Sequence, residues 1–227
     1  MPTSEVFNMD CMEGMAKYPD KYFELAIVDP PYGIGFSKYN GTTYKKGVNK
    51  SKKGFANKKL YKKKEWDNNI PEEIYFKELL RISKNQIIWG GNYFTEFLYP
   101  TKSWIFWDKK IINNTIKNYA DGELAWTSFD ITLRKFTYDW IGLGYCNSSE
   151  KGSKIHPTQK PVALYKWLLS NYAKQGDKIL DTHLGSGSSR IAAYDLGFDF
   201  TGFELDKDYF EAQEKRFNDF KAQLKLF

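Results

Sequence analysis

Two patterns of apolar residues divide the chain into predicted strands and helices. Short apolar runs that end in prolines, glycines or charged residues predict buried strands at residues 23–28, 86–89 and 103–107. Pro71 is followed by two glutamates and by apolar residues at helical spacing over residues 74–82, where Ile74, Phe76, Leu79, Leu80 and Ile82 are expected on one face. This pattern predicts a helix after the first strand.

The last third of the chain alternates regularly between the two kinds of element. Helices are predicted over residues 161–173, 188–196 and 208–220, and strands over residues 178–181 and 198–204. A strand, a glycine turn, a helix, a strand and a further helix in succession indicate a parallel sheet with right-handed crossovers. The expected fold class is therefore α/β.

Residues 109–150 show only short β-like segments, at 123–127 and 132–138, with loops between them. This range is predicted to be a small insertion, and residues 1–108 and 151–227 are predicted to form one domain. A length of 227 residues agrees with one main core.

The positive charge of the chain is concentrated in one segment. The net charge is +6, yet eleven lysines and no acidic residue lie between residues 30 and 64, and the rest of the chain carries 23 basic and 28 acidic residues. Glycines, Asn and Ser without apolar periodicity predict a mobile loop over residues 36–64. The segment is either a solvated loop or, given its interleaved aromatic residues, an arm that contacts nucleic acid.

Composition argues against several classes of protein. No apolar run approaches the roughly 20 residues of a membrane span, and the first 25 residues lack the apolar stretch of a signal peptide, so we expect a cytoplasmic protein. Two cysteines, Cys11 and Cys146, and two histidines in separate contexts predict neither a disulfide scaffold nor a zinc site.

A glycine-rich turn is the first candidate site. Gly185 and Gly187 lie between a predicted strand and helix, and Glu204 ends the next strand 19 positions later, the spacing of an acid that binds ribose hydroxyls. Arg190 replaces the third glycine of dinucleotide-binding proteins, which favours a nucleoside cofactor without phosphates. The alternative is an ordinary tight strand-to-helix turn together with a solvated glutamate. Asp181 either caps the helix or holds a cationic amino group.

The sequence Asp29-Pro30-Pro31-Tyr32 follows the first predicted strand. Two prolines remove two backbone donors and leave rigid carbonyl acceptors beside a carboxylate and an aromatic ring. Such a group suits a planar ring that carries an amino group, with Tyr32 stacked on it. The alternative is a strand stopped by prolines and capped by Asp29.

Together these motifs resemble those of S-adenosylmethionine-dependent DNA amino methyltransferases, specifically adenine-N6 enzymes of the permuted beta type. The resemblance rests on residues 29–32, on the loop 181–187, on His-Pro-Thr-Gln-Lys-Pro at 156–161 and on Met-Asp-Cys at 9–11. The order of that family is reproduced, with the catalytic motif first, the insertion in the middle and the cofactor motif last. One departure is Thr182-His183 after Asp181, where the family usually has Pro-Phe.

The resemblance implies a Rossmann-like methyltransferase fold with helices on both faces of the sheet, and an insertion that reads the target. It implies direct methyl transfer to a flipped-out adenine in double-stranded DNA, without metal, by a homodimer-forming family. The implied catalytic residues are Asp29, Pro30, Pro31 and Tyr32. The implied S-adenosylmethionine contacts are Asp10, Cys11, Asp29, Lys160, Asp181, Gly185, Ser186, Gly187, Glu204 and Leu205.

Beside such a pocket, the lysine-rich segment is expected to bind the DNA backbone. The candidate residues are Lys38, Lys45, Lys46, Lys52, Lys53, Lys58 and Lys59. Two other readings stay open: methylation of cytosine N4, RNA or a protein amide, and a catalytically silent nucleic-acid-binding relative. Cytosine enzymes tend to begin the catalytic motif with Ser and protein-glutamine enzymes with Asn, so Asp29 favours adenine.

Overall fold

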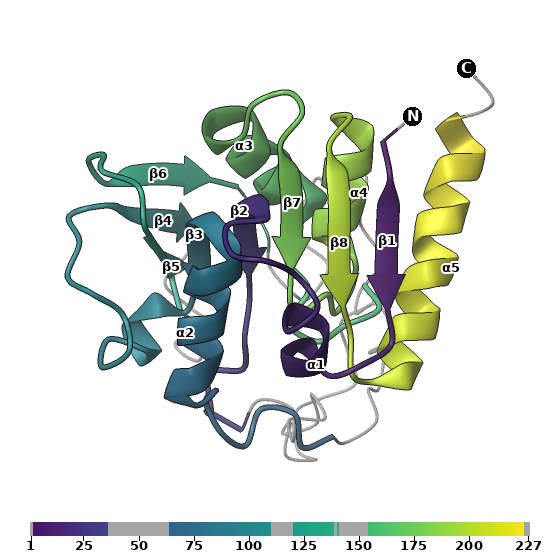
Figure 1. Cartoon of the computed structure of the whole chain (residues 1–227). Helices are drawn as coiled ribbons and strands as arrows, with labels where there is room; N and C mark the ends of the chain where they lie inside the picture. The colour runs from purple at the N-terminus through teal and green to yellow at the C-terminus, as the bar shows by residue number, and fades with distance from the viewer. Residues whose placement is uncertain (1, 36–63, 110–119, 139, 141–153, 225–227) are drawn as a thin grey trace, which may run out of the picture.

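The computed structural model describes residues 2–35, 64–109, 120–138, 140 and 154–224 (Figure 1). The lysines singled out for DNA contact lie outside the described residues, as does Cys146.

Eight strands form one sheet in the order β1-β8-β7-β2-β3-β5-β4-β6. The strands are β1 (Ser4–Phe7), β2 (Phe23–Val28), β3 (Ser83–Trp89), β4 (Trp104–Asp108), β5 (Gly122–Thr127), β6 (Arg134–Thr137), β7 (Lys178–Asp181) and β8 (Asp199–Phe203). Among these described strands β5 alone is antiparallel to its neighbours, β3 and β4. The sheet is therefore mostly parallel, as the sequence pattern predicts.

Helices cover both faces of this sheet. They are α1 (Cys11–Met15), α2 (Glu73–Ile82), α3 (Val162–Tyr172), α4 (Ser188–Asp195), α5 (Lys207–Leu224) and a short 3₁₀ turn, η2 (Gly91–Tyr93). Buried residues of α1 and α2 belong to one hydrophobic cluster, and those of α3 and α4 belong to another. Helix α5 contacts α4 at the β1 end of the sheet (Figure 1).

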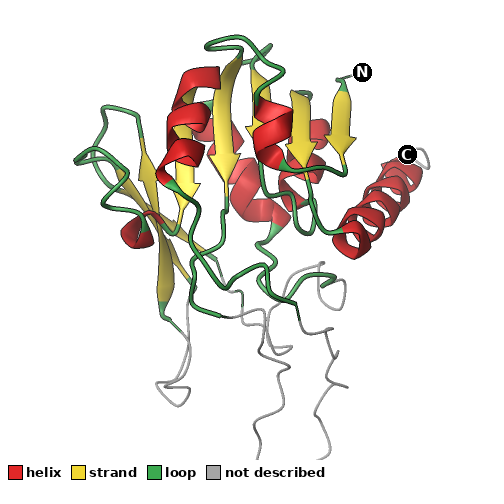
Figure 2. Ribbon diagram, turned by 60° about the horizontal axis from the view of Figure 1, so that its bottom comes forward, coloured by secondary structure: helices red, strands yellow, loops and turns green. Residues whose placement is uncertain are grey.

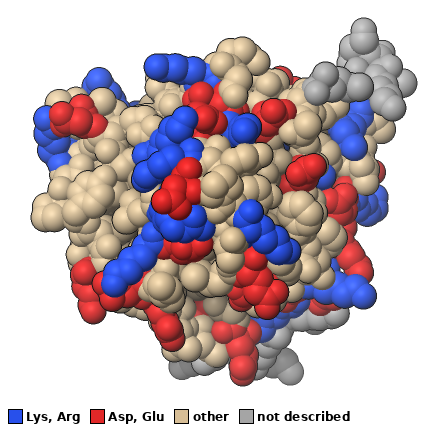
Figure 3. Space-filling view, viewed as in Figure 1, with Lys and Arg blue, Asp and Glu red and all other residues tan. Residues whose placement is uncertain are grey.

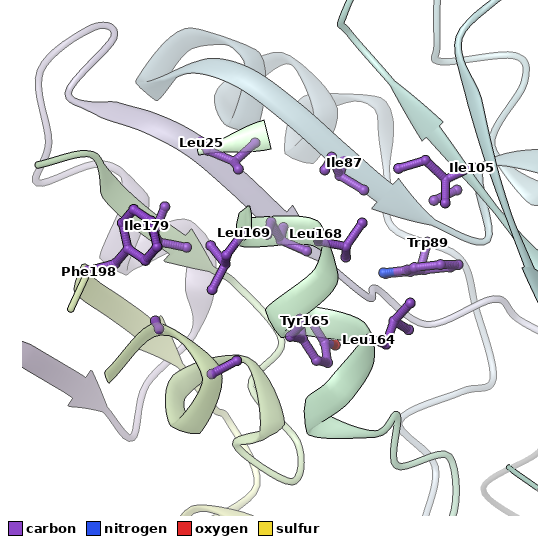
Figure 4. Packing of buried hydrophobic residues seen from close by; sticks show 14 of the residues in the cluster. Leu25, Ile87, Trp89, Ile105, Leu164, Tyr165, Leu168, Leu169, Ile179 and Phe198 are labelled. Carbon is purple, nitrogen blue, oxygen red and sulfur yellow. The ribbon is translucent and has the colours of Figure 1, made fainter. Parts of the chain in front are cut away.

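The alternation of side chains along β2 explains why both faces need cover. Leu25 and Ile27 pack in the cluster beneath α3 and α4, whereas Ala26 and Val28 pack in the cluster beneath α1 and α2. A strand buried on both faces is continuously apolar, which is the pattern of residues 23–28. Figure 4 shows the cluster beneath α3 and α4, with side chains of α3 packed against strands β2, β3 and β7.

The structure corrects some details of the predicted elements. Helix α2 buries Tyr75, Phe76, Leu79 and Ile82, whereas Ile74, expected on the buried face, is 55% exposed. Strand β1 and helix α1 were not predicted, because an edge strand of four residues with alternating burial gives a weak apolar signal. Strands β5 and β6 lie within the predicted insertion but are part of the main sheet.

The chain changes direction across the sheet between β7 and β2. From β7 the connection through α4 leads outward to β8, while from β2 the chain continues on the other side to β3. The carboxyl ends of such neighbouring strands are where parallel sheets bind ligands. The loops that follow these strands come together along one edge of the molecule (Figure 2). This edge holds both sequence motifs.

The charged side chains on the surface do not single out a binding site in the way that this edge does. Basic and acidic side chains are interspersed over the face seen in Figure 3. No helix within the described ranges is both long and apolar enough to cross a membrane.

Candidate functional site

A cavity of about 520 Å³ opens at the carboxyl ends of β2, β7 and β8. Its volume is in the range of pockets that hold small organic ligands. Most residues implied by the motifs line it, namely Asp10, Cys11, Asp29, Pro31, Lys160, Gly185, Ser186, Glu204 and Leu205. Pro30, Tyr32, Asp181 and Gly187 do not line it. The fold therefore brings residues from the two ends of the chain to one cavity.

Glu204 connects the end of β8 to the glycine turn after β7. Its Oε2 accepts a hydrogen bond from the Gly185 amide at 2.7 Å, and its Oε1 accepts one from the Asp206 amide at 2.8 Å. Burial raises the pKa of Glu204, and the two amides partly offset this effect. Gly185 has a φ of 51°, and a Cβ there would lie 3.8 Å from His156, another residue that lines the cavity. The absence of a side chain leaves this space open.

Asp10 and Cys11 enter the cavity from the start of α1. The Asp10 side chain caps this helix, since its Oδ1 accepts from the Met12 amide at 2.7 Å. Burial, with the neighbouring Asp10 carboxylate, raises the pKa of the Cys11 thiol to about 12, so the thiol is neutral. The Asp10 carboxylate is thus held at the cavity wall by a local backbone contact.

Asp181 and Gly187 make contacts that hold the turn after β7 and the start of α4 in place. Asp181 is 1% exposed; its Oδ2 accepts from the Ser189 hydroxyl at 2.5 Å, and its Oδ1 accepts from the His183 amide at 3.0 Å. Burial raises the pKa of Asp181 to about 7. Gly187 has a φ of 69°, and a Cβ there would lie 3.1 Å from the Gln213 side chain. These two residues brace the turn around the cavity.

The catalytic candidates form a buried network at the end of β2. Tyr32 donates its hydroxyl hydrogen to Asp29 Oδ1 at 2.6 Å, and Lys160 Nζ lies 2.5 Å from Asp29 Oδ2. Lys160 is 4% exposed and also pairs with Glu123 at 3.1 Å. Glu123, from β5, pairs in turn with Lys109 at 2.5 Å. A chain of alternating charges therefore holds the Asp29 carboxylate.

Burial and charge act in opposite directions on these groups. Burial raises the pKa of Asp29, although the Lys160 ammonium lowers it in part. For Glu123, Lys160 and Lys109 outweigh burial and lower the pKa to about 2. The two carboxylates raise the pKa of Lys160 despite its burial. A buried lysine between two acids is charged, so Lys160 favours the ionised form of Asp29 against the effect of burial.

The position of the Tyr32 ring is set by its packing against neighbouring residues. It stacks on Tyr93 with ring centroids 5.0 Å apart and an angle of 17°, and it meets the edge of Phe94 at 6.1 Å. Gly90 has a φ of 70°, and a Cβ there would lie 2.2 Å from the Tyr32 ring. Tyr93 is 44% exposed. The sequence Gly90-Gly91 after β3 thus provides room for the aromatic ring of the catalytic motif.

Another wall of the cavity contains residues that the motifs did not single out as site residues. His156 packs between Trp66 and Tyr209, at centroid distances of 5.1 and 4.3 Å. Burial, with the nearby Lys160, lowers the pKa of His156 to about 3, so the ring is neutral. Lys64 pairs with Asp206 and Asp208 and lies over the Tyr209 ring. His156 is therefore part of an aromatic wall.

The sequence motifs did not point to Glu123, which pairs with the lysine that contacts Asp29. It lies in a segment with weak β-like signals, and its contact with Lys160 spans 37 residues of sequence. Within the described ranges no group of three His, Cys, Asp or Glu side chains is placed to hold a metal ion.

Comparisons with known proteins place this geometry in a family. The model of a family described as DNA methylase (N6_N4_Mtase) matches residues 97–215, more than half of the chain. The type II methyltransferase M.HinfI of Haemophilus influenzae is 27% identical over 93% of this chain and 67% of its own length.

Solved structures share the fold. The M1.HpyAVI–S-adenosylmethionine complex matches with a TM-score of 0.55 and 19% identity, over 93% of this chain and 98% of that one. The cytosine-N4-specific PvuII DNA methyltransferase matches with a TM-score of 0.57 and 13% identity, over 98% and 93%. These likenesses confirm the predicted Rossmann-like methyltransferase fold. Together with the family match over more than half of its residues, they lead to one conclusion: the chain belongs to the DNA methylase family of N6 and N4 amino methyltransferases.

Proposed function

We propose that this protein is an adenine-N6 DNA methyltransferase of the permuted beta type that takes its methyl group from S-adenosylmethionine. The observation that carries the proposal is that Asp29, of the Asp-Pro-Pro-Tyr sequence, lines the same cavity as Glu204 and Gly185 of the glycine turn. A target amino group held at Asp29 would therefore lie beside a cofactor held at Glu204. Both motifs are needed for one transfer reaction, and neither would be useful alone.

The residues present fit S-adenosylmethionine. Glu204 offers carboxylate oxygens to ribose hydroxyls, and Asp10 offers one to the adenine amino group. The open space at Gly185 admits the chain of the methionine part. When bound, the cofactor supplies a methyl group on a positively charged sulfur, which reacts with an amine without a metal or a strong base.

The network around Asp29 orients the target. The amino group of a base is inaccessible within the duplex, so the base must be flipped into the site. There Asp29 and the Pro30 carbonyl would accept its two amino hydrogens while the Tyr32 ring packs against its face. Positive charge develops on the amino nitrogen during transfer, and an ionised Asp29 stabilises it. Lys160, implied as a cofactor contact, lines the cavity and would also favour the ionised form of Asp29, because it pairs with Asp29 directly.

The DNA itself would be held by parts of the chain outside the cavity. The lysine-rich segment over residues 36–64 begins four positions after Tyr32, so it is attached to the loop that carries the catalytic motif. Its charge suits contacts with the phosphate backbone. We assign target recognition to part of residues 109–150, because this range follows β4 and includes β5, whose Glu123 reaches the network of Asp29. Residues 1–108 and 151–227 would form the catalytic domain.

Cytosine-N4 methylation is the second candidate, because PvuII methyltransferase, which is cytosine-N4-specific, has the same fold. Asp29 in the first position of the motif favours adenine. The decisive experiment incubates unmethylated genomic DNA, and total RNA in a parallel reaction, with cofactor labelled in the methyl group, then digests each nucleic acid for mass spectrometry. Label in N6-methyladenine supports the proposal. Label in N4-methylcytosine, or label transferred only to RNA, contradicts it.

Cofactor binding is tested separately by calorimetry. Glu204→Ala should weaken binding of S-adenosylmethionine by about 1–3 kcal/mol, the cost of removing hydrogen bonds to a buried carboxylate. Glu211→Ala, an exposed glutamate on α5, is the matched control and should leave the affinity unchanged. If Glu204→Ala binds as tightly as the unmodified protein, the cofactor does not contact Glu204.

A further inference from the structure

Asp67 is an almost fully buried carboxylate that contacts the catalytic loop from a distant part of the chain. It is 2% exposed, and its Oδ1 accepts hydrogen bonds from the amides of Tyr32 and Gly33, both at 2.9 Å. Its backbone carbonyl accepts a third hydrogen bond, from the Gly35 amide at 2.9 Å. Three amide donors of one loop thus converge on a single residue that lies 35 positions beyond Tyr32.

The sequence of the loop explains why such a partner is needed. Pro30 and Pro31 have no amide hydrogen, so the first backbone donors after Asp29 are those of Tyr32 and Gly33. Gly33 has a φ of 70°, a conformation that L-residues rarely adopt. Successive amides in such a turn form a concave site for an anion. Here the anion is the side chain of Asp67, and its charge makes both hydrogen bonds stronger than neutral ones.

The residues on either side of Asp67 also contact the catalytic loop and the cavity wall. A Cβ on Gly33 would lie 3.1 Å from both the backbone nitrogen and a methyl group of Ile70, so the two segments are in close contact. On the other side of Asp67, the Trp66 ring packs against His156 in the aromatic wall of the cavity. Asp67 therefore joins a segment anchored at the cavity to the loop that carries Tyr32.

We propose that Asp67 is a positioning residue for methyl transfer, which fixes the backbone of Tyr32 so that its ring and hydroxyl meet the target base and Asp29. This inference rests on the proposed function. Without Asp67 the two amides would be left without their anion, and the loop would lose its fixed position while Asp29, Glu204 and Asp10 stay in place. The loss should therefore appear in turnover and not in cofactor affinity.

The first experiment measures the contact without any assay of activity. Hydrogen exchange by mass spectrometry is followed in the peptide that spans residues 29–35, in the unmodified protein, in Asp67→Asn and in Asp67→Ala. Because the Asp67 side chain accepts from the amides of Tyr32 and Gly33, exchange at these two amides should be at least tenfold faster in Asp67→Ala. The Gly35 amide donates to the Asp67 backbone carbonyl, which the substitution keeps, so its exchange should change less. Asp20→Ala, an exposed aspartate that pairs with Arg81, is the control and should leave exchange in this peptide unchanged.

The second experiment tests the role in transfer with a double-mutant cycle on DNA labelling. Asp67→Ala should lower kcat at least tenfold and change the Kd of S-adenosylmethionine less than twofold. Asp67→Asn keeps an oxygen acceptor and should recover part of the missing turnover. In a Tyr32→Ala background, Asp67→Ala should lower the residual turnover less than twofold, because the ring that it positions is already absent.

Several results would overturn the inference. Full additivity of the two substitutions would show that Asp67 acts independently of Tyr32, and an equal loss of cofactor affinity would give it a general structural role. Unchanged exchange in residues 29–35 would remove the contact itself. If Asp67→Ala does not fold, the same double-mutant cycle with Tyr32→Ala is measured with Asp67→Asn. Absence of methyl transfer by the unmodified protein would contradict the proposed function, while the exchange result would still decide the Asp67 contact.

Discussion

At the scale of single residues, the same chemical group takes different roles according to its partners. Asp29 and Asp181 both end parallel strands beside the cavity, but only Asp29 meets a lysine. Asp181 has two neutral hydrogen-bond donors, and burial then dominates its pKa. Motif similarity alone assigns both to the cofactor, whereas their surroundings differ: Asp29 is paired with a charged lysine and Asp181 is held by neutral donors.

Asp29→Ala should abolish turnover and leave cofactor affinity unchanged. The interaction of this carboxylate with the amino group strengthens as positive charge develops, so its loss acts on kcat. Labelled-cofactor assays give kcat, and calorimetry gives the Kd. Thermal unfolding and DNA binding are the controls for folding. Substantial turnover in Asp29→Ala would exclude this residue from catalysis.

The raised pKa of Asp181 predicts a dependence of stability on pH. An unfolded Asp ionises near pH 4, whereas the folded group ionises near pH 7, so the folded protein binds more protons between these values and its stability falls as pH rises. Asp181→Asn removes the titrating group, so the variant does not lose stability for this reason as pH rises. The variant should therefore gain stability relative to the unmodified protein from pH 4 to 7, by roughly 4 kcal/mol at most.

Urea unfolding at pH 4.5, 6 and 8 measures this difference. Asp199 is a control of opposite sign, because a hydrogen bond from the Thr3 amide lowers its pKa. Its pH-dependent contribution lies below the unfolded pKa near 4, so the stability of Asp199→Asn relative to the unmodified protein should stay nearly constant from pH 4.5 to 8. A difference for Asp181→Asn that does not change with pH would show that Asp181 is ionised in the fold.

At the scale of elements, the site depends on how turns follow strands. The turn Gly90-Gly91 after β3 leaves room for the Tyr32 ring, and the turn after β7 is held by Glu204, which follows β8. Each turn thus contacts a residue that follows another strand of the sheet. The pairing of β2 with both β3 and β7 brings the two turns to the same cavity edge.

Gly90→Ala should lower turnover strongly while cofactor affinity is kept. A Cβ at this position would lie 2.2 Å from the Tyr32 ring and the backbone would be strained at a φ of 70°, so the ring must move. Gly176→Ala is a matched control for strain, because Gly176 has a φ of 92° with no atom near its Cβ position. Loss of turnover in both variants to the same degree would indicate general destabilisation.

At the scale of the whole molecule, the uneven charge predicts how DNA binding responds to salt. Replacing Lys38, Lys45, Lys52 and Lys58 by Gln should flatten the slope of log K against log salt by up to about 0.9 for each phosphate that these lysines neutralise. Fluorescence anisotropy with labelled duplex DNA measures the slope. Calorimetry should show that the affinity for S-adenosylmethionine is unchanged.

A variant with the same change of charge elsewhere separates local contact from net charge. Lys77, Lys84, Lys207 and Lys215 are more than half exposed in their side chains and pair with neighbouring acids. Replacing these four by Gln should leave the slope nearly unaltered. If both variants flatten the slope equally, the lysine-rich segment has no special role and is a solvated loop.

The sequence by itself predicted most strands and helices of the sheet, although not β1 and α1, and it singled out the two motifs. Strands β2 and β7 were predicted with their observed ends, because a strand buried on both faces must be continuously apolar and is stopped by its own turn residues. Local spacing also indicated the glycine turn and its glutamate, since Gly185 follows β7 and Glu204 follows β8, the two consecutive strands of one crossover unit. These features are encoded within short stretches of chain.

Only the tertiary structure decided which groups meet around Asp29 and the loop that follows it. Lys160, Glu123 and Asp67 lie on three separate segments, and nothing in their local sequence states that they meet at the loop after β2. The roles of Asp181 and Gly187 in bracing the turn were hidden for the same reason. Burial and long-range pairing set the pKa values and positions of these side chains, and both arise from the order of strands in the sheet.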